Sequence, residues 1–135
     1  MIQDYKDLFS LKGKRALVTG GAQGLGLAIA EAFCAAGAVV TVADINAGAA
    51  AEAAKALRAE GAEAYALACD VSREKQVARM IQDAANAMGG LEIVVANAGV
   101  SERAPAEEMT LDQWNKVIDI DLKGVFLCDR EAGRY

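Results

Sequence analysis

The chain has 135 residues, enough for one folded domain with a sizeable core and too few for two. Hydrophobic residues make up 54% and charged residues 24%, which is typical of a folded domain and excludes a disordered one. The formal net charge of −5 argues against a general nucleic-acid or anionic-membrane binder, so a bound phosphate would have to be held by local geometry.

Cysteine and histidine usage excludes further classes. Cys34, Cys69 and Cys128 form no CxxC pair, so we expect buried reduced thiols rather than a disulfide framework or a zinc site. The absence of histidine excludes Ser-His-Asp and Cys-His catalysis and most transition-metal sites, and we expect no metal. The start, MIQDYKDLFS, does not resemble a secretory signal, and no uncharged stretch is long enough to span a membrane. We therefore expect a cytoplasmic protein.

The first half of the chain predicts two strand–helix units. Residues 15–19 form a short apolar run, followed by glycines and a helical pattern that starts at Leu25 and ends at Gly37. Residues 38–43 are again apolar and β-branched and lead to Asp44, and an Ala-rich helix is predicted over residues 47–60.

The second half continues the alternation. Residues 63–69 predict a weaker strand, and Ser72 is a candidate cap for a helix that ends at Gly89. A fourth strand over residues 91–96 is followed by a turn, a loop, the capping-box pattern Thr110–Gln113 and a last helix. Such alternation indicates βαβ units, and hence a parallel sheet with helices on its faces.

The glycines after the first strand have the spacing Gly20-x-x-x-Gly24-x-Gly26, which fits neither a P-loop nor G-x-G-x-x-G. A Gly-rich turn between a strand and a helix N-terminus can nevertheless hold a pyrophosphate, because free N–H groups and the helix dipole favour an anion. The alternative is a merely tight turn.

Asp44 ends the second predicted strand, where an acid can accept hydrogen bonds from both ribose hydroxyls of an adenosine and would repel a 2′-phosphate. Gln23 and Ile45 add no positive charge, so the sequence favours NAD over NADP. An ordinary strand-end or helix-cap acid remains the alternative for Asp44.

Four features in this order resemble the short-chain dehydrogenase/reductase family: the Gly-rich turn after Thr19, the acid Asp44, the pair Asp70-Val71 and the triplet Asn97-Ala98-Gly99. The resemblance implies a Rossmann-type doubly wound parallel sheet, here incomplete, with about four strands in the order 3-2-1-4 and helices on both faces. It also implies that Asp70 and Val71 lie near the adenine, and that Asn97 to Gly99 border the cofactor and stabilise the central strand. Taken alone, Asn97 could be only a turn residue and Asp70 only a cap. The predicted cofactor contacts are Thr19, Gly20, Gln23, Gly24, Leu25, Gly26, Asp44, Ile45, Asp70, Val71, Asn97, Ala98 and Gly99.

The chain departs from the family pattern at two places. Asp121 stands where the family has an Asn that helps to organise a proton relay, so it is a doubtful catalytic residue that could still relay protons through its main chain. Helical spacing puts its carboxylate on the apolar face of Trp114, Val117 and Ile118, and the alternative is an acid that escapes to solvent at a helix edge. The catalytic Tyr-x-x-x-Lys of the family, and the Ser upstream of it, are absent: none of the three tyrosines, Tyr5 among them, is followed four residues later by Lys.

The resemblance implies an NAD(H)-dependent oxidoreductase that moves a hydride between an alcohol and a ketone or aldehyde, and the early region resembles enzymes with sugar, polyol or 3-oxoacyl substrates. We expect residues 1–135 to form a single NAD-binding domain, the N-terminal portion of such an enzyme and inactive by itself. A non-catalytic nucleotide-binding module or an inactive truncated product is the alternative. The fourth strand would be an unpaired apolar edge, so we expect a homo-oligomer, a dimer or tetramer.

Overall fold

The computed structural model describes residues 8–135, so Tyr5 and most of the segment that we excluded as a secretory signal lie outside the described residues. Its elements, in chain order, are β1 (Arg15–Thr19), α2 (Gly24–Ala35), β2 (Val39–Asp44), α3 (Ala47–Ala59), β3 (Ala64–Ala68), α4 (Glu74–Met88), β4 (Ile93–Val95), α5 (Leu111–Val117), the π-helical segment η1 (Ile118–Gly124) and α6 (Val125–Arg134). The predicted alternation of strands and helices is confirmed.

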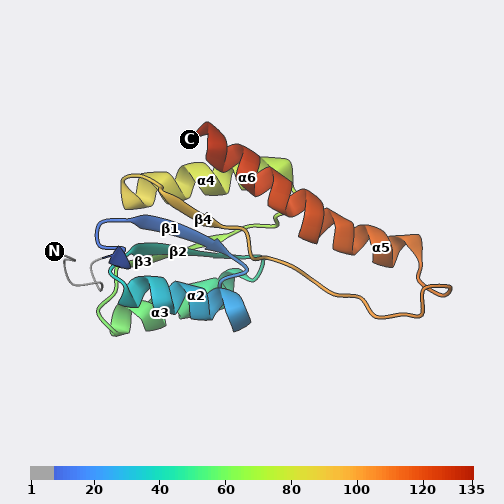
Figure 1. Cartoon of the computed structure of the whole chain (residues 1–135), viewed down its shortest axis with the longest axis horizontal. Coiled ribbons are helices and arrows are strands. Elements are labelled where there is room, and N and C mark those ends of the chain that lie inside the picture. The colour runs from blue at the N-terminus through green and yellow to red at the C-terminus, as the bar shows by residue number, and fades with distance from the viewer. Residues whose placement is uncertain (1–7) are drawn as a thin grey trace.

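The four strands form one parallel sheet in the order β3-β2-β1-β4, which confirms the predicted order. Helices α2 and α3 cover one face of this sheet, and α4 and α6 cover the other (Figure 1). Because the strands are parallel and Thr19 pairs with Ala43, which pairs in turn with Leu67, their carboxyl ends lie together at one edge. Ligands bind at this edge in open α/β sheets.

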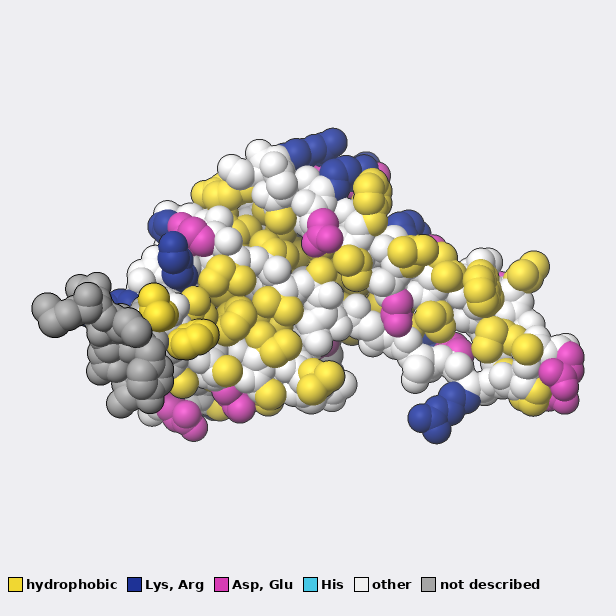
Figure 2. Space-filling view, in the orientation of Figure 1, with side chains coloured by type: hydrophobic (Ala, Val, Ile, Leu, Met, Phe, Trp, Pro, Cys, Tyr) yellow, Lys and Arg dark blue, Asp and Glu magenta, His cyan; other side chains and the backbone are white. Residues whose placement is uncertain are grey.

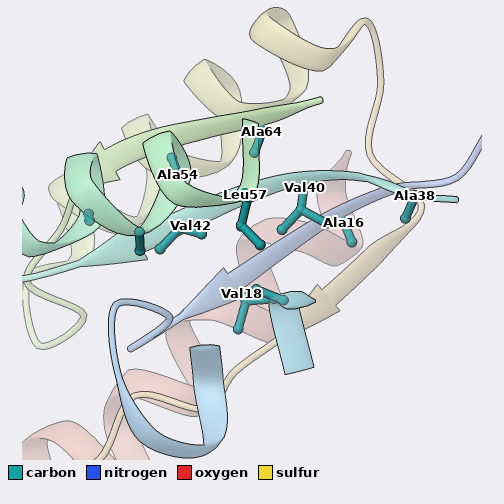
Figure 3. Packing of buried hydrophobic residues seen from close by; sticks show 11 residues of the cluster. Ala16, Val18, Ala38, Val40, Val42, Ala54, Leu57 and Ala64 are labelled. Carbon is teal, nitrogen blue, oxygen red and sulfur yellow. The ribbon is translucent and has the colours of Figure 1, made fainter. Parts of the chain in front are cut away.

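Two hydrophobic clusters hold the layers together. Side chains of a strand alternate between its two faces, so Val18 and Val40 both point to the face that α2 and α3 cover. There they belong to one cluster with Ala54 and Leu57 of α3 (Figure 3). Leu17 and Ala43 point to the other face and pack with α4. Helix α4 buries an apolar stripe there, formed by Val77, Met80, Ile81, Ala84 and Met88.

Strand β4 is the edge that the sequence predicted. All three of its residues are half-buried, whereas the apolar residues of β1 are fully buried. An ion pair between Arg15 and Glu92 joins the start of β1 to the residue before β4. The Arg15 guanidinium also donates to the Gly89 carbonyl at 2.5 Å. The fourth strand is shorter than the predicted 91–96 because residues 91–92 and 96 do not join the ladder.

The helix signals were partly right. Gly89 ends α4 with a left-handed φ of 76°, and Thr110 and Gln113 form the predicted capping box, with Gln113 N–H donating to Thr110 Oγ1 at 3.2 Å. Ser72 does not cap α4, which contradicts our expectation. Arg73 holds the N-cap position, because the Ser72 amide and hydroxyl are both bound to the Asp70 carboxylate.

The last helical region projects away from the sheet at its α5 end (Figure 1). Leu111, Trp114, Leu122 and Phe126 expose more than half of their surface along it. Figure 2 shows hydrophobic side chains both on this projection and over the middle of the same face. Within residues 8–135, no helix is long and apolar enough to cross a membrane.

Candidate cofactor site

A cavity of about 380 Å³ opens at the carboxyl ends of the strands, and every predicted cofactor contact lines it. It is bordered by the turn after β1, the end of β2, the end of β3 and the segment after β4. The cavity also takes in Ala43, Cys69, Val100 and Ile120, which sequence reasoning missed. The first three adjoin predicted motifs in sequence, whereas nothing in the sequence signalled Ile120.

The turn after β1 depends on glycine at particular positions. Gly20 and Gly24 have φ of 60° and 56°, a region that side chains disfavour, and a Cβ on Gly26 would overlap the Gly20 carbonyl oxygen. Helix α2 begins at Gly24 with no side-chain cap and no acid in its first turn. Its first amide groups therefore border the cavity without an intrahelical partner, an arrangement suited to an anion.

Leu25 lies at the rim of this cavity rather than in the core. Its side chain is 80% exposed, whereas Ile29 and Phe33 pack against the first hydrophobic cluster. The predicted helix is confirmed as α2. Its first apolar residue, Leu25, borders the candidate cofactor cavity and does not pack on the sheet.

Asp44 presents its carboxylate at the end of β2. Its Oδ2 accepts the Ala22 N–H at 3.3 Å, and its Oδ1 accepts the Asn46 N–H at 3.0 Å. These two donors orient the carboxylate where it borders the cavity beside Ile45, which is 71% exposed. Asp44 therefore links the glycine turn after β1 to the residues just before α3. These hydrogen bonds fit a structural strand-end acid as well as an acid that binds ribose.

Asp70 has a local role as well. Its Oδ1 accepts the Ser72 N–H at 3.0 Å and the Ser72 hydroxyl at 2.7 Å. Burial raises the pKa of the Asp70 carboxyl, but the Ser72 hydrogen bonds and the nearby Arg73 charge outweigh it, so this pKa lies below its usual value. Beside it, burial and the neighbouring Cys128 raise the pKa of the Cys69 thiol to about 12, so the thiol stays protonated.

Asn97 ties the end of β4 to the glycine turn. Its Nδ2 donates to the carbonyl oxygens of Thr19 at 3.0 Å and Gly20 at 3.2 Å. Thr19 Oγ1 accepts the backbone N–H groups of Asn97 and Ala98, each at 3.1 Å, and donates to Val95 O at 3.3 Å. This network fixes the spacing between the two strand ends that border the cavity.

The expectation that Asp121 shares a buried apolar face with Trp114 is wrong, because Asp121 is exposed and Trp114 is 56% exposed. The alternative, an acid that reaches solvent, is confirmed. Two assumptions failed: Trp114, in the regular helix α5, is not on a buried face, and residues 118–124 form a π-helical segment rather than a helix with 3.6 residues per turn. Asp121 does not line the cavity, but its Oδ1 accepts the Val100 N–H at 2.8 Å. It therefore fixes one wall of the cavity from outside.

The described residues contain no cluster of three or more metal-ligating side chains. A parallel sheet in this order, with a Gly-rich first turn opening onto the carboxyl ends of the strands, defines a Rossmann-type α/β protein.

The family model described as short chain dehydrogenase matches residues 14–135, and the chain belongs to the short-chain dehydrogenase/reductase family. It is 42% identical over 121 residues to a cis-4-hydroxycyclohexanecarboxylate dehydrogenase from Sinomonas cyclohexanicum, a match that covers 89% of this chain and 48% of the relative. It is 40% identical over 130 residues to a sorbose reductase from Candida albicans, covering 95% of this chain and 46% of the relative. The chain spans about half the length of the curated relatives it matches.

Solved structures of the same family have the same fold as this chain. A short-chain type dehydrogenase/reductase from Mycobacterium marinum matches with a TM-score of 0.94 and 36% identity, over 98% of this chain and 53% of that one. A short chain dehydrogenase from Burkholderia cenocepacia, solved in complex with NADP, matches with a TM-score of 0.87 and 34% identity, over 93% of this chain and 51% of that one. The family therefore supports a nicotinamide dinucleotide as the ligand and leaves the choice between NAD and NADP open.

Proposed function

We propose that this chain binds NAD(H) and is the cofactor-binding half of an oxidoreductase that moves a hydride between an alcohol and a ketone or aldehyde. The observation that carries the proposal is the Asp44 carboxylate, held by two backbone N–H groups at the end of β2 and bordering the same cavity as the glycine turn. In this fold the pyrophosphate belongs at the glycine turn and the adenosine ribose at such an acid.

The cofactor preference follows from charge. The Asp44 carboxylate can accept from the 2′- and 3′-hydroxyls of a ribose but would repel a 2′-phosphate. Among residues 8–135, no Lys or Arg lines the cavity to attract that phosphate. We therefore propose NAD rather than NADP, although one structural neighbour was solved with NADP.

The test is calorimetric titration of the chain with NADH and with NADPH. We expect tighter binding of NADH, and Asp44→Ala should weaken it by about tenfold or more, since a hydrogen bond to a charged group contributes roughly 1.5–3 kcal/mol. NADPH affinity should stay unchanged or rise. The matched control is Asp83→Ala, an acid on the surface of α4. An NADH-to-NADPH preference that Asp44→Ala leaves intact would remove Asp44 from the ribose site.

We propose that the 135 residues bind the cofactor without turning over substrate by themselves. The sequence has no Tyr-x-x-x-Lys. Of the two tyrosines within residues 8–135, neither lines the cavity, and Tyr65 donates its hydroxyl to Glu63 at 2.9 Å. The Asp121 carboxylate is bound to the Val100 N–H, so we propose that Asp121 contributes to a proton relay only through its main chain. The other groups of that relay are not among these 135 residues. A sugar, polyol or 3-oxoacyl substrate stays a proposal, which the similarity to a sorbose reductase supports for sugars.

A non-catalytic nucleotide-binding module is the second candidate, favoured by the same missing Tyr-x-x-x-Lys. An NADH titration paired with an assay for sorbose- or polyol-dependent change in NADH absorbance separates the candidates. Binding without turnover by any longer form of the protein would support the module, and turnover by a longer form would support the oxidoreductase.

We also propose that residues 1–135 fold as one domain and associate with further copies. The half-buried β4 edge and the exposed apolar side chains of α5, η1 and α6 support association, because such surfaces are costly to leave in water. Light scattering of the purified chain tests it. The cytoplasmic location stays a prediction.

A further inference from the structure

A second cavity, of about 310 Å³, lies between α5 and the segment after β3. Ser72, Asp112, Asn115, Lys116, Asp119 and Ile120 line it. Ile120 lines the first cavity too, and Ser72 follows Val71, another lining residue of the first cavity. The two cavities are therefore neighbours, separated by Ile120 on one side and the Val71–Ser72 backbone on the other.

Strand order indicates which end of a bound dinucleotide lies next to the second cavity. With the pyrophosphate at the turn after β1 and the ribose at Asp44 after β2, the adenine continues in the same direction, towards the end of β3. There the cavity is lined by Asp70 and Val71. The adenine therefore occupies the part of the first cavity that adjoins the second.

The chemistry of Asp70 orients the base. An ionised carboxylate only accepts hydrogen bonds, and adenine has one exocyclic donor, its 6-amino group. Asp70 Oδ1 accepts from Ser72, while Oδ2 forms an exposed ion pair with Arg73 Nε at 3.6 Å, which leaves room for a further donor at Oδ2. The 6-amino group thus faces Asp70 Oδ2 and the residue to which Asp70 is bound, Ser72, in the wall of the second cavity.

We propose that the cofactor site continues past the adenine into the second cavity, and that the protein accepts an adenine dinucleotide carrying a short substituent on its 6-amino group. This inference rests on the proposed NAD(H) site. A secondary amine keeps one N–H for Asp70, so the substituent does not cost that hydrogen bond.

The charges around the second cavity favour a cationic or hydrogen-bonding substituent over an anionic one. Lys116 is engaged by Glu102 at 2.5 Å, and Asp119 by Lys123 at 2.8 Å. Asp112 has no ion-pair partner among residues 8–135 and leaves one uncompensated negative charge in the lining. An ammonium group is attracted to it, and a carboxylate is repelled.

The experiment compares three ligands by calorimetric titration: NADH, N6-(2-aminoethyl)-NADH and N6-carboxymethyl-NADH. We expect the aminoethyl compound to bind within about threefold of NADH and the carboxymethyl compound to bind more weakly than either. Asn115→Phe places bulk in the second cavity and should weaken the aminoethyl compound by about tenfold while leaving NADH unchanged. Gln82→Phe on the exposed face of α4 is the matched control and should change neither.

Each result decides one question. If NADH binds and the aminoethyl compound is weaker by about tenfold or more, the second cavity is not part of the site and this inference is wrong, while the proposed NAD(H) site stands. If Asn115→Phe changes neither ligand, the substituent does not enter the second cavity, and the inference is again wrong. If NADH itself does not bind, the proposed function fails, and this inference fails with it.

Discussion

Gly24 and Gly61 allow backbone strain to be separated from the loss of ligand space. Both have left-handed φ values, 56° and 90°, and a Cβ at either position would meet no atom within 4 Å. Replacing either by Ala should therefore cost a similar amount of folding free energy, about 1–2 kcal/mol, which arises from the backbone alone. Only Gly24 borders the candidate cofactor cavity. Gly24→Ala places a methyl group where the pyrophosphate must approach the turn, so we expect NADH affinity to fall by about tenfold or more, or at least 1.4 kcal/mol.

The assay has two parts. Urea unfolding followed by circular dichroism should show comparable destabilisation of Gly24→Ala and Gly61→Ala, and calorimetry should show normal NADH binding for Gly61→Ala alone. Gly20 is a poorer test, because a Cβ there would come within 2.8 Å of Ala98 Cα and disturb the fold. NADH binding by Gly24→Ala equal to that of the unchanged chain would refute the assignment of this turn as a phosphate cradle.

Three further predictions test the surroundings of the site. The hydrogen bond from Arg15 lowers the pKa of Glu92 from 4.5 to about 2, so the stabilisation by this pair is complete above pH 4.5 and is lost as the pH falls towards 2. The urea midpoints of the unchanged chain and Glu92→Gln should therefore differ at neutral pH and converge at low pH; a constant gap would show that the pair does not stabilise the β4 edge through charge. Asp121→Ala removes the acceptor for the Val100 N–H and should cost about 1 kcal/mol of stability and weaken NADH binding, whereas Asp121→Asn keeps an acceptor oxygen and should do neither. In thiol titration with a chromogenic disulfide at pH 8, Cys69 should react only on unfolding, because it is buried and its pKa is near 12; rapid reaction of all three cysteines in the native protein would contradict this.

Local signals predicted the fold well because the fold is built from local units. The Gly20-x-x-x-Gly24-x-Gly26 spacing and the apolar runs before and after it each specify a backbone conformation that neighbouring residues alone can enforce. The same holds for the capping box at Thr110, where both partners lie within one turn. Strand order needed the family resemblance, since periodicity indicates strands without saying which of them pair.

The errors arose where a tertiary contact or a departure from regular geometry decided the outcome. Ser72 is a good capping residue, but the Asp70 carboxylate binds both its amide and its hydroxyl, and so Arg73 takes the cap position. Asp121 and Ile120 were misplaced or missed because the π-helical segment shifts the register of side chains by a fraction of a turn. No residue pattern in residues 118–124 predicts a π-helix.

The π-helical segment also explains how a distant helix reaches two walls of the candidate site. At one end, Asp121 accepts the Val100 N–H; at the other, a Cβ on Gly124 would come within 2.8 Å of Val71 Cγ2, so the helix backbone packs directly against the segment after β3. Val100 and Val71 both line the cavity, the first in the segment after β4 and the second in the segment after β3. The π-helical segment therefore contacts two of the segments that border the cavity, at Val100 through Asp121 and at Val71 through Gly124.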